Sequence, residues 1–259
     1  MLHLRFALLT LGTGVTLFVV MLLLIEAGRR LGVRQSKLRG ADARAGVGVV
    51  DGAVYGLLAL LVGFMFSGAA GRFNERQHLI AGEVNVTGTA WQRIAVLPDE
   101  QQPAVRDLFR HYVDAVLAWY AEAPGATTVR EPPAVTRAQN DLWARSVIAS
   151  GRPSTPAGVF YLSAVNEMFG AVEQERMARR IHPPSLIFAM LGIAAVATAI
   201  FAGYGIASGA SRNWIYIVGV AATIAIATYV ILELEYPRLG LFRVNAMDQT
   251  LVELRATMN

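Results

Sequence analysis

Four uncharged stretches of this sequence are long enough to cross a lipid bilayer as helices. They lie at residues 6–25, 52–71, 183–211 and 213–232. The hydrocarbon core of a bilayer is about 30 Å thick and needs about 20 apolar residues in a helix. Inside lipid, every backbone polar group must be paired within its own helix. The sequence therefore predicts an all-α integral membrane protein with transmembrane helices at 6–26, 51–71, 185–207 and 213–234.

The first stretch lies near the start of the chain, where a signal peptide would also place an apolar segment. It is longer than the apolar region of such a peptide, and it is followed by Glu26 and Arg29 instead of a small-residue cleavage site. We expect a retained helix and a multi-pass protein of the cell inner membrane. Lys and Arg near the span ends divide seven to eight between the two sides, so their distribution does not decide the orientation.

The composition excludes several classes of function. The chain is 54% hydrophobic, above the roughly 45–50% usual for soluble domains, and it contains no cysteine, which excludes disulfides and thiolate chemistry. Its net charge of +4 (23 − 19) is not concentrated in a basic run of the kind that binds nucleic acid.

Catalytic and metal-binding motifs are also missing from the sequence. The four histidines have no metal-ligand spacing; they are His3, His78, His111 and His182. The sequence contains no phosphate loop, nucleophile elbow or dinucleotide fingerprint. We therefore expect no enzyme, no metal and no cofactor.

The remaining segments predict a basic loop at 27–50, a helical extramembrane domain at 72–184 and a C-terminal segment at 235–259. The apolar stripe of the second span continues past residue 79, which predicts one unbroken helix to about Leu97. Apolar residues then recur every three or four positions between Pro103 and Glu122, as in an amphipathic helix. A shorter helix around Trp143 follows, and Thr155 with Pro156 is a helix start.

Glycines mark the second span as the helix most suited to close packing. They are Gly52, Gly56, Gly63 and Gly68. Small residues let another backbone approach a membrane helix closely. Leu60 and Phe64 lie four residues apart on one face of the same helix, and Arg72 and Arg76 continue beyond its apolar part.

The second span carries a resemblance to a known family. Gly63-Phe64 followed eight residues later by Arg72-Phe73 resembles the neck helix of the bestrophin channels. The chain from about 51 to 244 is similar to the bacterial bestrophin-like domain proteins, a membrane family of unassigned function. The motifs that carry this similarity are Glu83, Asn85, Gly88-Thr89-Ala90, Leu97-Pro98, Tyr112-Val113, Glu233-Leu234-Glu235-Tyr236-Pro237, Gly240 and Arg243-Val244.

The resemblance implies a homopentameric anion channel with five copies of the second span around its axis. The three bulky neck residues of bestrophins correspond here to Gly56, Leu60 and Phe64, and the glycine shortens the implied constriction. The acidic run that binds calcium in animal bestrophins has no equivalent, so calcium gating is not implied. The partners would be inorganic anions, the lipid bilayer and further copies of the chain.

Physical reasoning leaves two interpretations open. Apolar rings gate by dewetting and arginine rings draw anions, whereas Phe and Leu in a membrane helix usually serve packing. A non-conducting scaffold or sensor whose helical domain binds a partner would use the same four spans. Glu233 and Glu235 end the fourth span, where an ion pair is the commoner role. We expect Arg72 to be buried against Glu75, Glu233 or Glu235, because an unpaired charge there is costly.

Overall fold

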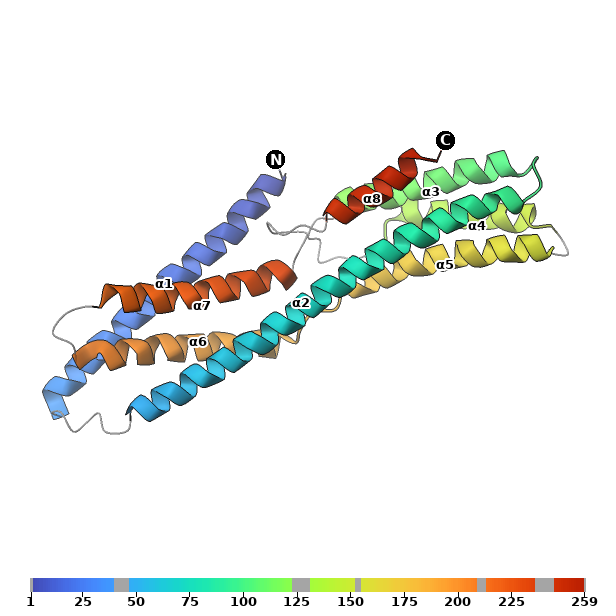
Figure 1. The fold of residues 1–259 in the computed structure, drawn as a ribbon. Coiled ribbons are helices and arrows are strands. Elements are labelled where there is room, and N and C mark those ends of the chain that lie inside the picture. Colours follow the sequence, from blue (N-terminus) through green and yellow to red (C-terminus); the bar gives the residue numbers. More distant parts are fainter. Residues whose placement is uncertain are drawn as a thin grey trace. The chain divides into compact units, whose positions relative to one another are not determined.

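The fold is all-helical throughout the residues that the computed structural model describes, which are 2–39, 47–122, 131–151, 155–208, 213–235 and 245–258 (Figure 1). The α-helices are α1 (Leu2–Arg39), α2 (Val47–Arg93), α3 (Gln102–Glu122), α4 (Pro133–Ala149), α5 (Pro156–Ala178), α6 (Ser185–Gly205), α7 (Trp214–Glu235) and α8 (Asn245–Ala256). Short 3-10 turns follow α2 and α6: η2 (Ile94–Val96) and η3 (Ile206–Ser208).

Four of these helices, α1, α2, α6 and α7, are long and apolar enough to cross a membrane. The prediction of an all-helical protein with four candidate spans is therefore confirmed. The second span runs without a break from Val47 to Arg93, as its apolar stripe indicated.

The first helix is longer than expected. The sequence predicted a span at 6–26 and a loop from 27 onward, but α1 continues to Arg39, so residues 27–39 are helical. Glu26 explains the continuation, because it accepts hydrogen bonds from Arg29 (2.8 Å) and Arg30 (2.9 Å) one turn later. Such i,i+3 and i,i+4 pairs stabilise a helix. The rest of the predicted loop up to residue 46 lies outside the described residues.

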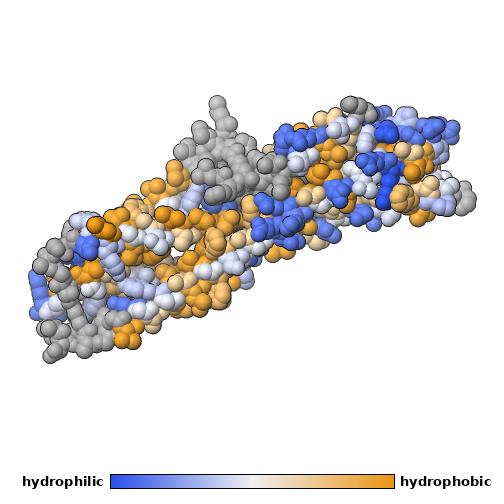
Figure 2. Space-filling model, in the orientation of Figure 1, coloured by the Kyte–Doolittle hydropathy of each residue, from blue (hydrophilic) through white to orange (hydrophobic). Residues whose placement is uncertain are grey.

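The chain forms two compact units. Unit 1 comprises Met1–Arg72 and His182–Leu241, and unit 2 comprises Phe73–Ile181 and Phe242–Asn259. Figure 2 shows apolar residues over much of the visible surface of unit 1, as expected for helices that face lipid. The C-terminal helix α8 belongs to unit 2, which the sequence did not indicate.

Unit 1 is packed around a close approach of α1 and α6. A Cβ atom added at Gly203 would lie 1.9 Å from the backbone oxygen of Ile25, and one at Gly28 would lie 2.1 Å from that of Ile200. One turn later, a Cβ at Gly32 would lie 2.6 Å from the Cβ of Ala207. Only glycine permits this backbone separation, which is the small-residue packing typical of membrane helices.

The predicted packing glycines of α2 do not take part in any such contact within the described chain. A Cβ at Gly52, Gly56 or Gly63 would meet no atom within 4 Å, and one at Gly68 would meet only the side chain of Arg72. The expectation of close packing at these positions is therefore not met within one chain. It stays a prediction for contacts between chains.

Unit 2 is a bundle of helices around a core of its own. Its core consists of large apolar side chains, several of them aromatic and almost fully buried; they include Phe109, Tyr112, Trp119, Leu142, Tyr161 and Met168. Helix α5 begins where the sequence predicted, since the Thr155 hydroxyl accepts a hydrogen bond from the Gly158 amide (3.0 Å) and Pro156 follows it.

Helix α8 completes this core from the C-terminal end of the chain. Leu251 of α8 and Met258, just after the end of α8, are buried among the core residues. Arg255 donates two hydrogen bonds to Asp114 of α3, at 2.7 and 2.8 Å. The C-terminal segment is therefore part of the structure of unit 2.

Candidate functional site: the exposed face of α2 and its ion pair

The membrane part of α2 has one narrow buried side. Asp51, Leu58, Met65 and Ala69 are buried, and their spacing of seven and four residues places them on one stripe of the helix. Leu58, Met65 and Ala69 pack in the apolar core of unit 1. This stripe holds α2 against the other helices of unit 1 and determines which residues face away.

The predicted neck residues all lie on the exposed side. Gly56 is exposed, Leu60 keeps 53% of its surface and Phe64 keeps 65%. With about 100° of rotation per residue, Gly56 and Leu60 lie almost opposite the buried stripe, and Phe64 lies next to Leu60. A single chain thus leaves this face of α2 without cover.

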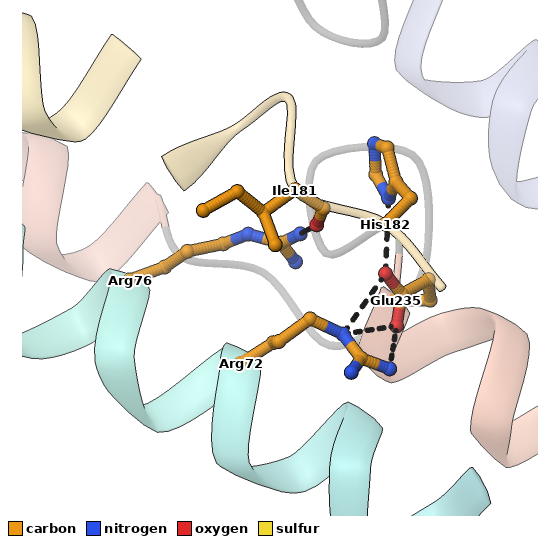
Figure 3. A network of polar contacts seen from close by, with 5 residues as sticks. All are labelled: Arg72, Arg76, Ile181, His182 and Glu235. Atoms are coloured by element: carbon orange, nitrogen blue, oxygen red, sulfur yellow. Dashed lines mark hydrogen bonds and ion pairs between the residues drawn. The ribbon is translucent and has the colours of Figure 1, made fainter. Parts of the chain in front are cut away.

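Arg72 lies at the end of the apolar part of α2 and is paired within unit 1 (Figure 3). Its Nη2 atom donates to Glu235 Oε2 at 2.7 Å, and its Nε atom donates to Oε1 at 3.2 Å and to Oε2 at 3.0 Å, a bidentate arrangement. The Glu235 side chain is fully buried, whereas Arg72 keeps 26% exposure. The ion pair expected from the sequence is present, and Glu235 of the three candidate carboxylates supplies it.

His182 joins the same carboxylate, which sequence reasoning missed. Its Nδ1 atom lies 2.9 Å from Glu235 Oε1 (Figure 3). The buried carboxylate of Glu235, at the end of α7, thereby contacts both α2, through Arg72, and the segment before α6, through His182. The sequence carried one signal for this role, His182-Pro183-Pro184, because two prolines hold a histidine at the start of the third span. No regular spacing linked this histidine to Glu235.

The other site candidates differ in their surroundings. Arg76 belongs to unit 2, is buried, and donates to the Ile181 carbonyl at 3.3 Å. Glu233 is buried in unit 1, 1% exposed. Tyr236, Pro237 and the later motif residues Gly240 and Arg243-Val244 lie outside the described residues. Arg72 and Arg76 are therefore engaged within one subunit and are not open cations.

Unit 2 contains a buried polar cluster that the sequence did not predict as a site. The Tyr120 hydroxyl donates to Glu83, at 3.0 Å from Oε2 and 3.1 Å from Oε1. Arg179 Nε donates to Glu175 at 2.6 Å, and its guanidinium lies 4.4 Å from the centre of the Tyr120 ring. Burial, and then the charge of Glu83, raise the pKa of Tyr120 well above its usual value.

In this cluster Glu175 is paired with Arg179 and Glu83 accepts hydrogen bonds from Tyr120, which explains why the two carboxylates are tolerated at 2% and 1% exposure. Within the described ranges, no group of three or more His, Asp or Glu side chains is arranged to hold a metal ion. The cluster therefore has the features of a structural network of unit 2.

The fold and these contacts define a multi-pass helical membrane protein with a separate helical unit. The chain belongs to the Bestrophin-like domain family, whose model matches residues 29–247. Comparison with functionally curated proteins found no similar sequence.

Solved structures of bacterial bestrophin homologues from Klebsiella pneumoniae share the fold. One single-residue variant is 14% identical, with a TM-score of 0.68 over 95% of this chain and 99% of that chain. A second variant is 16% identical, with a TM-score of 0.66 over 93% and 98%. A structure solved by zinc phasing is 13% identical, with a TM-score of 0.64 over 92% and 98%.

Proposed function

We propose that the protein is a homo-oligomeric ion channel in which the exposed face of α2 from each subunit lines the pore. The observation that carries the proposal is the contrast between the two sides of α2. One stripe packs in unit 1, while Gly56, Leu60 and Phe64 remain uncovered. Membership of the Bestrophin-like family supports a channel, and the neck resemblance supports a pentamer that conducts anions.

The proposed constriction works by dewetting. A ring of Leu60 and Phe64 side chains around a narrow axis excludes water, and an ion then loses its hydration on passing. Gly56 adds no side chain, so the apolar zone is two residues deep. We assign no anion attraction to Arg72, because Glu235 neutralises it within the subunit.

The ion pair has a positioning role in this proposal. Arg72 follows Phe64 by two turns of α2, and its bidentate contact with Glu235 fixes the rotation of α2 relative to α7. That rotation decides which side chains face the axis. We further propose that unit 2 is an extramembrane domain inserted between the second and third spans, since its large aromatic core is typical of a domain folded in water.

Planar-bilayer recording of the purified protein tests the pore. Replacing both neck residues, Leu60→Ala with Phe64→Ala, should widen and rehydrate the constriction and raise the single-channel current several-fold. Phe66→Ala is the matched control, because Phe66 is also exposed, at 47%, but lies about 200° around the helix from Phe64. Its current should equal that of the unchanged protein.

Four results would count against the proposal or part of it. If the unchanged protein and the double variant are both silent while correctly assembled, the protein is not a channel and the scaffold or sensor interpretation replaces it. A monomer or dimer by mass measurement cannot enclose an axial pore of single helices. Equal effects of Phe66→Ala and the double variant would place the pore elsewhere on α2. A cation preference would keep the pore but reject the anion assignment.

A further inference from the structure

The second half of α1 has two distinct faces. Gly28 and Gly32 are buried against α6 and η3. The opposite face is exposed over four turns, and its members recur every three or four residues; they are Leu23, Ala27, Arg30, Leu31, Arg34, Lys37 and Leu38. At about 100° per residue, all seven fall within about one third of the helix circumference.

The composition of this exposed face changes along the helix. Leu23 and Ala27 are apolar, whereas the last turns combine three cations with two leucines. Leu31 and Leu38 keep 55% and 77% of their surface, which is unusual for leucine beside water. Such a mixture suits a surface that contacts acyl chains and phosphate groups together.

The basic part of this face lies at the end of unit 1 where α6 stops. Helices α1 and α6 run in the same direction, because Gly28 lies against Ile200 and Gly32 against Tyr204. Helix α6 ends at Gly205, so Arg34 and the residues after it lie beyond the end of that span.

Aromatic residues mark the same end of unit 1. Trp214 begins α7, is 57% exposed, and is followed by the partly exposed Tyr216. Gly205 at the end of α6 lies beside Asp51 near the start of α2, which places the start of α2 at this end too. Tyr and Trp are enriched where membrane helices enter the headgroup layer.

The dimensions of the basic face match this layer. Each headgroup layer is about 5–8 Å deep, and Arg34 and Lys37, three residues apart, are separated by about 4.5 Å along the helix axis. Glu26 is paired with Arg29 and Arg30 and compensates part of the charge. Arg34 and Lys37 point the net positive charge of this face outward.

We propose that the exposed face formed by Arg30, Leu31, Arg34, Lys37 and Leu38 binds anionic phospholipids. The cations contact the lipid phosphates, and the two leucines contact the adjoining acyl chains. This site is separate from the proposed pore face of α2, and its presence does not depend on conduction. Each cation near an anionic surface contributes about a fivefold gain in lipid affinity.

Native mass spectrometry of the full chain in detergent tests the site by titration with phosphatidylglycerol and phosphatidylcholine. The unchanged protein should prefer phosphatidylglycerol at least tenfold. The double variant Arg34→Gln/Lys37→Gln should lose most of that preference. Arg106→Gln/Arg137→Gln in unit 2 removes the same charge elsewhere and should keep it. A third variant, Leu31→Ser/Leu38→Ser, should weaken binding of both lipids and leave their ratio unchanged.

Several outcomes would overturn the proposal. The unchanged protein could show no preference for phosphatidylglycerol. The preference could persist in Arg34→Gln/Lys37→Gln, or the control Arg106→Gln/Arg137→Gln could lose it equally. Displacement of the lipid by millimolar inorganic phosphate would show that the cations bind free anions and that the leucines contribute nothing. If the α1 variant changes the oligomeric mass while the lipid preference stays, the face is an interface between subunits.

Discussion

The two units of the molecule are packed by different rules. The interior of unit 2 consists of large side chains, among them Phe109, Trp119 and Tyr161. In unit 1 many interior positions are small, such as Ala194, Ala195, Ala199 and Ala221, and the tightest helix contact depends on glycine. The core of unit 2 is therefore filled by large side chains, whereas in unit 1 small residues let the helix backbones approach closely.

The difference fits the proposed location of unit 2 in water and of unit 1 in lipid. In water, burying a large apolar side chain is favourable because that surface leaves water. In lipid the acyl chains are as apolar as leucine, so burying leucine gains little, and association depends on close van der Waals contact. Membrane helices consequently gain more from small residues that let backbones meet. Four substitutions test this comparison, described from the largest expected effect to the smallest.

Replacing Gly203 by leucine should have the largest effect. The added side chain would meet the Ile25 backbone oxygen, and backbone cannot rotate away as a side chain can. We expect loss of the folded membrane protein, measured as monodisperse material in size-exclusion chromatography. Gly192→Leu in the same helix is the control, since nothing lies within 4 Å of its Cβ position, and it should remain folded. Equal yields of both variants would show that α1 and α6 are not packed through glycine.

Replacing Phe109 by alanine tests the other kind of core. Phe109 is fully buried and its ring lies 5.5 Å from that of Trp91. Removing a buried aromatic ring from a packed interior costs about 3–5 kcal/mol of unfolding free energy. Thermal unfolding followed by circular dichroism should show this loss, whereas Val159→Ala, at a 56% exposed position, should change stability by less than about 0.5 kcal/mol. A small effect at Phe109 would mean that unit 2 is loosely packed.

Replacing Arg72 by glutamine should destabilise unit 1 by about 3 kcal/mol, because the fully buried Glu235 carboxylate then loses its ion pair with the Arg72 guanidinium. The corresponding change in unit 2, Arg255→Gln, breaks an exposed pair with Asp114 and should cost only about 0.2–1 kcal/mol. Denaturation of both variants in the same detergent gives the comparison. Similar losses would mean that the Arg72 pair is as solvated as a surface pair.

The smallest effect concerns pH. Burial raises the pKa of Tyr161 to about 12, although its hydrogen bond with Ser146 acts in the opposite direction. Below pH 10 this tyrosine is mostly neutral in both states, so its ionisation does not change stability. Between pH 10 and 12 it ionises only in the unfolded chain, which then binds fewer protons, so stability falls as pH rises.

Tyr161→Phe removes this dependence. The variant loses the hydrogen bond to Ser146 and should be less stable by about 1 kcal/mol at pH 8. At pH 11 the unchanged protein has itself lost about 1.4 kcal/mol through the pKa difference, so the gap between the two should close. A gap that stays constant between pH 8 and 11 would show that Tyr161 is accessible to water.

The sequence predicted the elements of this fold much better than their contacts. Spans and helices follow from apolar length and periodicity, which are local properties, and the unbroken α2 and the Thr155 cap were both anticipated. The end of α1 was not anticipated. Glu26 and Arg29 indicated the end of a span, but their side chains pair with each other and the helix continues.

Contacts between distant segments depend on information that periodicity does not carry. Glycine in α2 and glycine at position 28 look alike in the sequence, and only the path of α6 decides that Gly28 makes the close approach. The sequence narrowed the partner of Arg72 to three carboxylates, because the end of the fourth span was predicted at residue 234 and α7 ends at Glu235. His182 was missed because a single histidine has no pattern.

The docking of α8 sets an order on the folding of the protein during synthesis. Leu251 and Met258 fill part of the core of unit 2, yet they are translated after α6 and α7. A ribosome that adds about 5–20 residues per second needs roughly 4 to 15 seconds to go from residue 181 to residue 258. During that interval the apolar surface of α3 that α8 will cover stays uncovered, and chaperone binding at this stage would protect an incomplete bundle from aggregation.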